Sequence, residues 1–307
     1  MKSTPKIFNI RYKASFESLT ANNHIKIWMA KPLNSECQKI NNFSISHTPK
    51  KTYKDGQGNE ILYFEFINTK KIEIKMEIQA ELWKQKIITQ NNAAVISKIY
   101  PKSIKRFLKN ENFLEQKLEI KNLAFKIAGK EKLDLDKIKT IFDFITKNFK
   151  YCYPIEKRGV KYLDLNGLKG DCGEYSSLFV TMCRILKIPA KNQTGFVIFP
   201  KKKKIAEHGW ASVYLKPNGW LDMDTQYASL EKNETATKKY FARRNDYRII
   251  FTTGFNVPLK PRIPKKFNLS YWNKLGLPLT HNSVQTLQPI VFVSKNKIEF
   301  KDNIKII

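Results

Sequence analysis

A cysteine, a histidine and an aspartate in the second half of the chain have the types and order of a nucleophilic site. Cys172 begins a helical pattern that continues to a break at Ile188-Pro189, and Asp171 is the expected N-cap of that helix. The positive end of a helix stabilises a thiolate, and its free N–H groups can bind a developing oxyanion. Cys172 therefore lies where a cysteine nucleophile gains most and where a structural cysteine gains little.

A predicted β-hairpin over residues 208–224 supplies the other two side chains. With its turn centred between Pro217 and Asn218, Asp224 is a diagonal neighbour of His208 on the same face. A base that a carboxylate orients toward a thiol is the arrangement of nucleophilic triads. The hairpin therefore predicts His208 as general base and acid, with Asp224 as the carboxylate that orients its ring.

Other cysteines and two tryptophans have simpler interpretations. Cys183 lies three helical turns after the candidate nucleophile and is expected to be a small buried hydrophobe. Cys152 is expected at an apolar strand position. Trp210 and Trp220 belong to the hairpin and are predicted to border a substrate groove as binding residues, with core packing as the alternative.

Helical patterns precede this region. Leucines, isoleucines and alanines from Leu114 to Ile127 fit one helix that stops near Gly129, within a helical connector predicted over residues 91–133. A second helix begins at Asp134, where acidic residues suit the positive helix end. It opens the predicted catalytic core, residues 134–256.

The flanking regions read as strands. Residues 1–90 contain about six short segments of strand type, and residues 72–82 alternate between apolar and polar side chains, which predicts a β-sandwich. Residues 257–307 form a Pro-containing extension that ends in a predicted strand pair about Lys295-Asn296.

Three motifs together carry a family resemblance. The runs GDCGEYSSLFVTMCRILKIPA, HGWASVY and GWLDMD, preceded by TIFDFITKNFKY, resemble the transglutaminase-like superfamily, whose core is related to papain-like cysteine proteases. The resemblance covers residues 135–255 well and residues 1–130 loosely. It implies an α+β core in which the helix that bears the cysteine packs on an antiparallel sheet, preceded by a β-sandwich. It also implies Cys172, His208 and Asp224 as the catalytic triad.

The implied activity is attack on an amide bond through a thioester acyl-enzyme. We expect a peptide or isopeptide hydrolase, because the resemblance is to members usually taken to be peptidases. A transamidating acyltransferase and a peptide:N-glycanase-type amidase are the enzymatic alternatives. A non-catalytic basic binding or scaffold protein is the alternative from another class.

Composition bears on partners and location. The formal net charge is +29, and the 56 Lys and Arg residues are mostly Lys. Phosphate and base recognition favour the bidentate Arg fork, so a lysine-rich surface argues against nucleic acid as the partner and leaves a protein or peptide substrate.

Four cysteines without paired spacing predict no disulfide framework and no zinc site, and no cofactor is expected. With no secretory signal or membrane-spanning run, we expect a cytoplasmic protein. The oligomeric state is not predicted.

Overall fold

The structure, a computed structural model, divides the chain into two compact units that each take several segments. The first unit contains residues 1–84, 194–208 and 245–307, and the second contains residues 85–193 and 209–244. The residues that the structure describes are 4–19, 22–84, 99–231, 238–243, 246–263, 283–285, 287–294 and 298–307.

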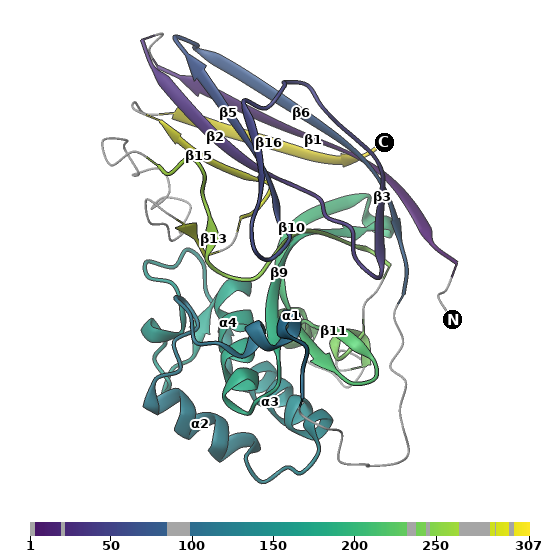
Figure 1. Ribbon diagram of the computed structural model, residues 1–307, viewed down its shortest axis with the longest axis vertical. Helices are drawn as coiled ribbons and strands as arrows, with labels where there is room; N and C mark the ends of the chain where they lie inside the picture. The colour runs from purple at the N-terminus through teal and green to yellow at the C-terminus, as the bar shows by residue number, and fades with distance from the viewer. Residues whose placement is uncertain are drawn as a thin grey trace. The chain divides into compact units, whose positions relative to one another are not determined.

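Two antiparallel four-stranded sheets form the frame of the first unit. Their strand orders are β16-β1-β6-β3 and β15-β2-β5-β4 (Figure 1). The six strands predicted in the N-terminal region are all present, and they supply three strands of each sheet. The strand bounds are β1 Lys6–Ser18, β2 His24–Lys31, β3 Gln38–Ile45, β4 Lys51–Lys54, β5 Glu60–Ile67, β6 Lys71–Leu82, β15 Ile290–Ser294 and β16 Ile298–Ile306.

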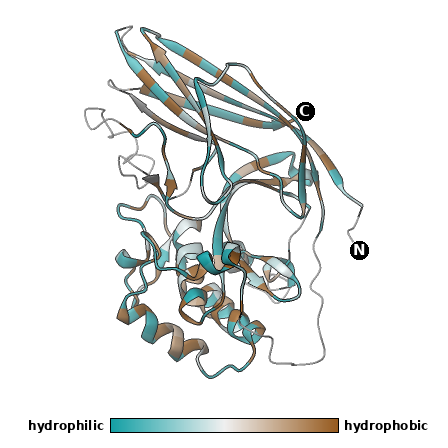
Figure 2. Cartoon of the chain, viewed as in Figure 1, coloured by the Kyte–Doolittle hydropathy of each residue, from teal (hydrophilic) through white to brown (hydrophobic). Residues whose placement is uncertain are grey.

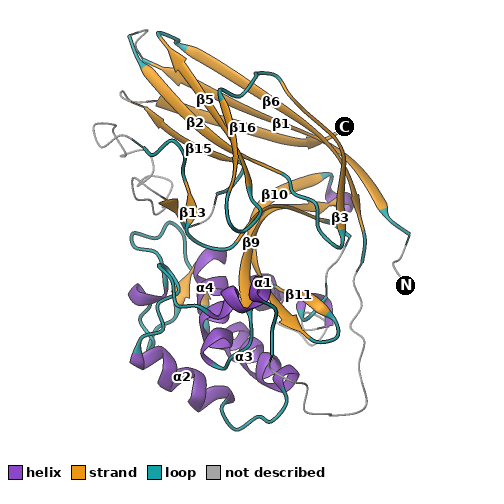
Figure 3. Ribbon diagram, viewed as in Figure 1, coloured by secondary structure: helices purple, strands orange, loops and turns teal. Residues whose placement is uncertain are grey.

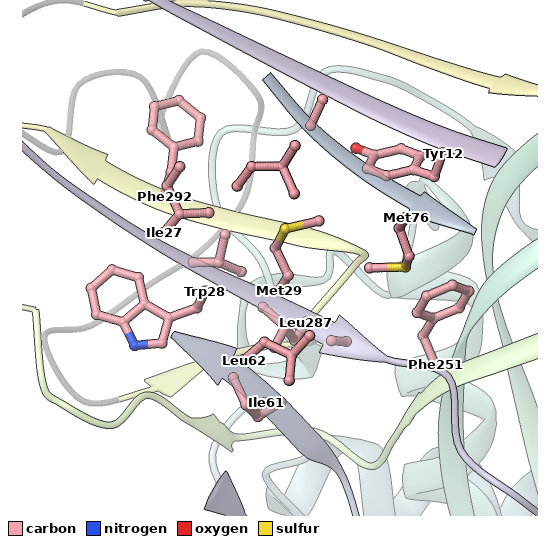
Figure 4. Packing of buried hydrophobic residues seen from close by; sticks show 14 of the residues in the cluster. Tyr12, Ile27, Trp28, Met29, Ile61, Leu62, Met76, Phe251, Leu287 and Phe292 are labelled. Carbon is pink, nitrogen blue, oxygen red and sulfur yellow. The ribbon is translucent and has the colours of Figure 1, made fainter. Parts of the chain in front are cut away.

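Alternation along the strands explains how these sheets bury one face. Every second residue of β6 is buried, from Ile72 to Leu82, and the residues between them are more exposed. Figure 2 shows the same alternation of hydrophobic and hydrophilic residues along the strands. The buried faces of the two sheets share one hydrophobic core. In Figure 4, Tyr12 and Met76 from one sheet and Met29 and Phe292 from the other contribute side chains to it. This confirms the predicted sandwich.

The last two strands correct the predicted C-terminal strand pair. β15 pairs with β2, with Val291 opposite Trp28, and β16 pairs with β1, with Phe300 opposite Phe16. The two segments are strands, as expected, but each completes a different sheet. The alternating pattern identifies a strand and its buried face, whereas the choice of neighbour is a long-range property that the pattern does not contain.

The division of the chain also differs from the four consecutive segments expected from the sequence. Because β15 and β16 join the sheets of the first unit, the C-terminal part of the chain is not a separate extension in the structure. Residues 264–282 of the predicted Pro-containing extension, residues 91–98 of the predicted connector and residues 85–90 of the predicted sandwich lie outside the described residues.

A third antiparallel sheet contains the predicted hairpin, in the strand order β11-β10-β9-β12. β9 and β10 each contribute residues to both units. Two short pairs complete the strands, β7 with β8 in parallel and β13 with β14 in antiparallel orientation. The bounds are β7 Lys150–Tyr151, β8 Lys169–Gly170, β9 Ala190–Phe199, β10 Lys204–Leu215, β11 Gly219–Met223, β12 Arg248–Thr253, β13 Val257–Pro258 and β14 Ser283–Val284.

Helices characterise the second unit (Figure 3). The predicted helices at Asp134 and Cys172 are confirmed as α3 and α4, and α4 contacts α2, α3 and α5. α2 begins later than expected, because Leu114 lies in a buried turn before it. No helix among the described residues is long and apolar enough to cross a membrane. The bounds are α1 Lys102–Lys105, α2 Leu118–Ala128, α3 Asp134–Asn148, α4 Cys172–Ile185 and α5 Thr225–Glu231.

Candidate active site

Cys172 is the first residue of α4. Asp171 caps the helix as predicted, and its side chain accepts a hydrogen bond from the Gly173 N–H at 2.8 Å. All four cysteines of the chain are free thiols; Cys172 is half-buried, whereas Cys183 on the same helix is completely buried. The prediction that Cys183 is a buried hydrophobe is confirmed, and Cys172 is the more exposed of the two cysteines on this helix.

Strand β10 passes directly beside the Cys172 sulfur. The backbone N–H of Gly209 donates a hydrogen bond to the thiol, and a Cβ placed on Gly209 would lie 3.7 Å from Cys172 Sγ. That Cβ would also lie 3.8 Å from the Gln193 carbonyl oxygen and 3.9 Å from Asn192 Oδ1. Gly209 therefore leaves room around the sulfur, and its close approach brings β9 and β10 together with the start of α4.

His208 is the residue before Gly209 in β10 and is buried, with 3% of its surface exposed. His208, the predicted base, is therefore joined directly to Gly209, whose backbone N–H contacts the Cys172 thiol. Sequence reasoning predicted the histidine but not the asparagine and glutamine of β9, Asn192 and Gln193. Their signal would have been two adjacent amide side chains in the polar first half of a strand whose second half is apolar.

The surroundings of the thiol correct our expectation about its ionisation. Burial raises the pKa of the Cys172 thiol, and the negative charge of Asp171 raises it further. The Gly209 N–H and the Arg158 guanidinium act in the opposite direction and do not offset these effects. The helix end was expected to favour a thiolate, but the capping carboxylate lies at that same end. The thiol consequently needs a base to accept its proton before it can act as a nucleophile.

A buried ionic cluster lies next to Cys172, and sequence analysis did not predict its centre. Arg158 Nη1 lies 2.7 Å from Asp171 Oδ1 and 2.8 Å from Glu174 Oε2, and Nη2 also contacts Asp171. The arginine is 5% exposed. Burial raises the pKa of Glu174 to about 8; Arg158 opposes this shift and Asp171 adds to it. The sequence feature that could have drawn attention to this position is that Arg158 is an arginine in a region whose other basic residues are lysines.

Asp224 follows β11 directly and is buried. Its Oδ1 accepts the Tyr227 N–H at 3.0 Å, which places it at the start of α5. The hairpin register pairs Ala211 with Met223, so the turn is centred on Pro217, half a residue from the predicted centre. A short helix after the second strand, which the sequence analysis did not predict, therefore fixes the backbone of the predicted orienting carboxylate.

The two tryptophans occupy different surroundings. Trp210 is completely buried, and its indole N–H donates to Gln193 Oε1 at 2.9 Å, which fits the core-packing alternative. Trp220 pairs with Tyr214 and packs edge-to-face on Phe107, with 5.0 Å between ring centroids. Tyr214 is five residues beyond Gly209 in the strand, roughly 16 Å at the usual rise. A role for Trp220 in substrate binding stays a prediction.

Comparison with known proteins identifies the family of this region. Residues 121–225 match the Transglutaminase-like superfamily, and this part of the chain is a transglutaminase-like domain. It includes Cys172, His208 and Asp224. The resemblance inferred from the three motifs is confirmed. The sequence has no significant match among curated proteins.

A solved structure shows the same fold. A candidate cysteine protease from Cytophaga hutchinsonii is similar over 100% of this chain and 92% of that chain, with a TM-score of 0.65 and 13% identity. The periplasmic domain of TgpA from Pseudomonas aeruginosa matches 76% of this chain and 93% of that chain, with a TM-score of 0.40 and 13% identity. The first of these likenesses extends over the α+β core and the sandwich, so the predicted fold class is confirmed.

Within the described part of the chain, no group of three or more His, Cys, Asp or Glu side chains is arranged to hold a metal ion.

Proposed function

We propose that this protein is a cysteine hydrolase that cleaves amide bonds in peptides or proteins through a thioester intermediate, with Cys172 as nucleophile. The observation that carries the proposal is the contact of the Cys172 thiol with the Gly209 N–H, at the start of a buried helix and one residue after His208. The transglutaminase-like domain and the fold shared with a candidate cysteine protease support it.

The first half of the reaction needs a base, because burial and Asp171 raise the pKa of the thiol. In the proposal, His208 accepts the thiol proton as Cys172 Sγ bonds to the carbonyl carbon, and Asp224 orients the imidazole. The Gly173 N–H already donates a hydrogen bond to Asp171. We therefore assign stabilisation of the oxyanion to the backbone N–H of Cys172. His208 then protonates the leaving amine as the carbon–nitrogen bond breaks, and a thioester remains.

Water completes the cycle. His208 removes a proton from a water molecule as the oxygen adds to the thioester carbonyl. The carbon–sulfur bond then breaks, the sulfur leaves with the bonding electrons and takes the proton back from His208, and the acid product ionises in solvent. The products are a carboxylate and the regenerated thiol, so no oxidant, reductant or further cofactor enters. An amine in place of water would give transamidation by the same steps, and the acceptor therefore distinguishes a hydrolase from an acyltransferase.

Labelling of the thiol tests the nucleophile. We expect an iodoacetamide probe to modify Cys172 preferentially, Cys172→Ala to abolish this signal, and His208→Ala to reduce it strongly at neutral pH. Cys152→Ala is the matched control, because Cys152 is also partly exposed but lies outside the helix. Full labelling of Cys172→Ala together with unimpaired labelling of His208→Ala would overturn the assignment.

Isotope incorporation tests the reaction. The chain is incubated with a mixed peptide library in H2(18)O, with a primary amine present as competitor, and the products are analysed by mass spectrometry. A hydrolase places one heavy oxygen in each new carboxylate, whereas an acyltransferase produces amides of the added amine. Release of free glycan from glycopeptides would instead indicate the N-glycanase-type alternative, and absence of any Cys172-dependent product would contradict an enzymatic role.

We also propose that the protein acts in the cytoplasm, where a free nucleophilic thiol stays reduced. Fractionation of the source cells, with Cys172 labelled before lysis by permeant and impermeant reagents, tests this. Protection from the impermeant reagent alone is the expected result.

A further inference from the structure

We propose that Arg158 is a positioning residue of this site, which fixes the loop before Cys172 and neutralises the two carboxylates that flank the thiol. The inference rests on the proposed function, because it concerns the reactivity of the same cysteine. Arg158 lies 14 positions before Cys172 and reaches the site only through the fold.

The contacts define a closed arrangement. Arg158 binds Asp171 through both terminal nitrogens, the bidentate geometry that arginine and not lysine provides. The same Nη1 binds Glu174 at 2.8 Å, and the Gly159 N–H approaches the other Glu174 oxygen at 3.4 Å. The two acids stand immediately before and two residues after Cys172, so the arginine holds both sides of the nucleophile.

The charges of the cluster explain why the arginine matters for reactivity. One guanidinium faces two carboxylates, and all three residues are at most 8% exposed. With both acids ionised, a net negative charge would lie beside the sulfur and oppose formation of a thiolate. Burial raises the pKa of Glu174 to about 8, whereas contact with Arg158 outweighs burial and lowers that of Asp171. At neutral pH the cluster is therefore neutral, but only while Arg158 is present.

A second buried arginine on the same helix provides a structural comparison. Arg184 is 1% exposed and binds the Ala190 and Lys109 carbonyl oxygens, each at 2.8 Å. It is 12 residues from Cys172, about 18 Å along the helix, and its hydrogen-bond partners are Ala190, Lys109 and Glu111 rather than the two acids beside Cys172. Loss of Arg184 should weaken the fold without altering the thiol, whereas loss of Arg158 should alter both.

The test is the pH dependence of Cys172 alkylation by iodoacetamide in the full chain, followed by mass spectrometry. We expect Arg158→Met to raise the midpoint of the profile by about one pH unit and to slow labelling at pH 7.5 about tenfold. Arg184→Met should leave the midpoint unchanged. Arg158→Met/Asp171→Asn, which removes one charge of each sign and retains a capping side chain, should return the midpoint toward that of the wild type.

Glu174→Gln tests the same charge balance without removing the arginine. Gln resembles the protonated acid, so labelling at pH 7 should stay within about twofold of the wild type. Above pH 8 the variant should react faster, because the wild type alone gains a second negative charge there.

The outcomes separate the two proposals. A wild-type profile in Arg158→Met overturns the role of Arg158. If that variant fails to fold, the alkylation profile of Glu174→Gln is the deciding measurement. A profile that runs parallel to that of the wild type above pH 8 overturns the proposed role of Arg158. If Cys172 of the wild type reacts no faster than Cys152 at any pH, the proposed function itself fails.

Discussion

Substitution of Gly170 by alanine tests how tightly the start of α4 is packed. The added Cβ would overlap the Cβ of Glu174, lie 2.9 Å from Glu174 Cγ and lie 3.3 Å from Phe149 Cε1. Gly170 has an ordinary negative-φ backbone, so the effect of the methyl group is steric. Because the Glu174 Cβ belongs to the first turn of the helix, relief of the overlap must displace either that turn or β8, and either movement disturbs the neighbours of Cys172.

The expected cost follows from two contributions. Overpacking of a filled site costs about 1–3 kcal/mol. Displacement of Glu174 also weakens its hydrogen bond to Arg158, and such bonds to charged groups contribute about 1.5–3 kcal/mol. We expect Gly170→Ala to lower the free energy of unfolding by about 4 kcal/mol, a large part of the roughly 5–15 kcal/mol by which a typical domain is stable.

Urea unfolding of Gly170→Ala, Glu174→Gly and the variant with both substitutions forms a double-mutant cycle, which measures the coupling between the two positions. Glu174→Gly should cost about 1 kcal/mol in helix propensity and about 1.5–3 kcal/mol for the lost contact with Arg158. The double variant should cost little more than Glu174→Gly alone, because the side chain that Gly170→Ala strikes is gone. The expected coupling is thus about 3 kcal/mol, well above the roughly 0.5 kcal/mol of independent sites.

Two results would refute this reasoning. If the free energy of unfolding of Gly170→Ala lies within about 1 kcal/mol of the wild-type value, the loop accommodates the added methyl group without strain. Strict additivity in the double variant would mean that the destabilisation does not pass through Glu174. Iodoacetamide labelling of Cys172 in Gly170→Ala adds an independent measurement, and we expect it to be slowed.

Two further predictions concern charged groups elsewhere. Burial raises the pKa of Glu65, but Lys50, Lys26 and His24 outweigh it and lower the pKa to about 2; the ionised acid therefore stabilises the fold above about pH 4.3. As pH falls from there toward 2, the free energy of unfolding of the wild type should fall by about 1 kcal/mol more than that of Glu65→Gln. Urea unfolding of both proteins across that pH range measures the difference. Arg184→Met should lower the free energy of unfolding by about 3–5 kcal/mol, because it leaves buried carbonyl oxygens and Glu111 without their cation; a loss below about 1 kcal/mol in thermal and urea unfolding would show that the helix end does not depend on it.

Local patterns in the sequence predicted the elements that carry their own periodicity. β6 and α3 are examples, since each buries one face and the spacing of its apolar residues states which face that is. The start of α4 was predictable for a related reason: Asp171 is a good capping residue, and the N-cap signal is local. The nucleophile could be proposed because it follows that cap.

Features that depend on distant neighbours were not predictable in this way. Nothing around Arg158 in the sequence shows that it binds Asp171, because the contact requires the loop between them to fold back. The short helix α5 after Asp224 has no apolar repeat long enough to indicate it. The hairpin centre was predicted half a residue from its position, because turn geometry sets register and the residue types left two centres open.

The pairing of β15 and β16 with the first two strands has a consequence for the order in which the protein can fold during synthesis. β1 and β2 leave the ribosome early, but each keeps an unpaired edge until residues 290–306 have followed. By then the ribosome has made all of the second unit, including Cys172. The sandwich therefore cannot serve as a finished platform for the residues made after it.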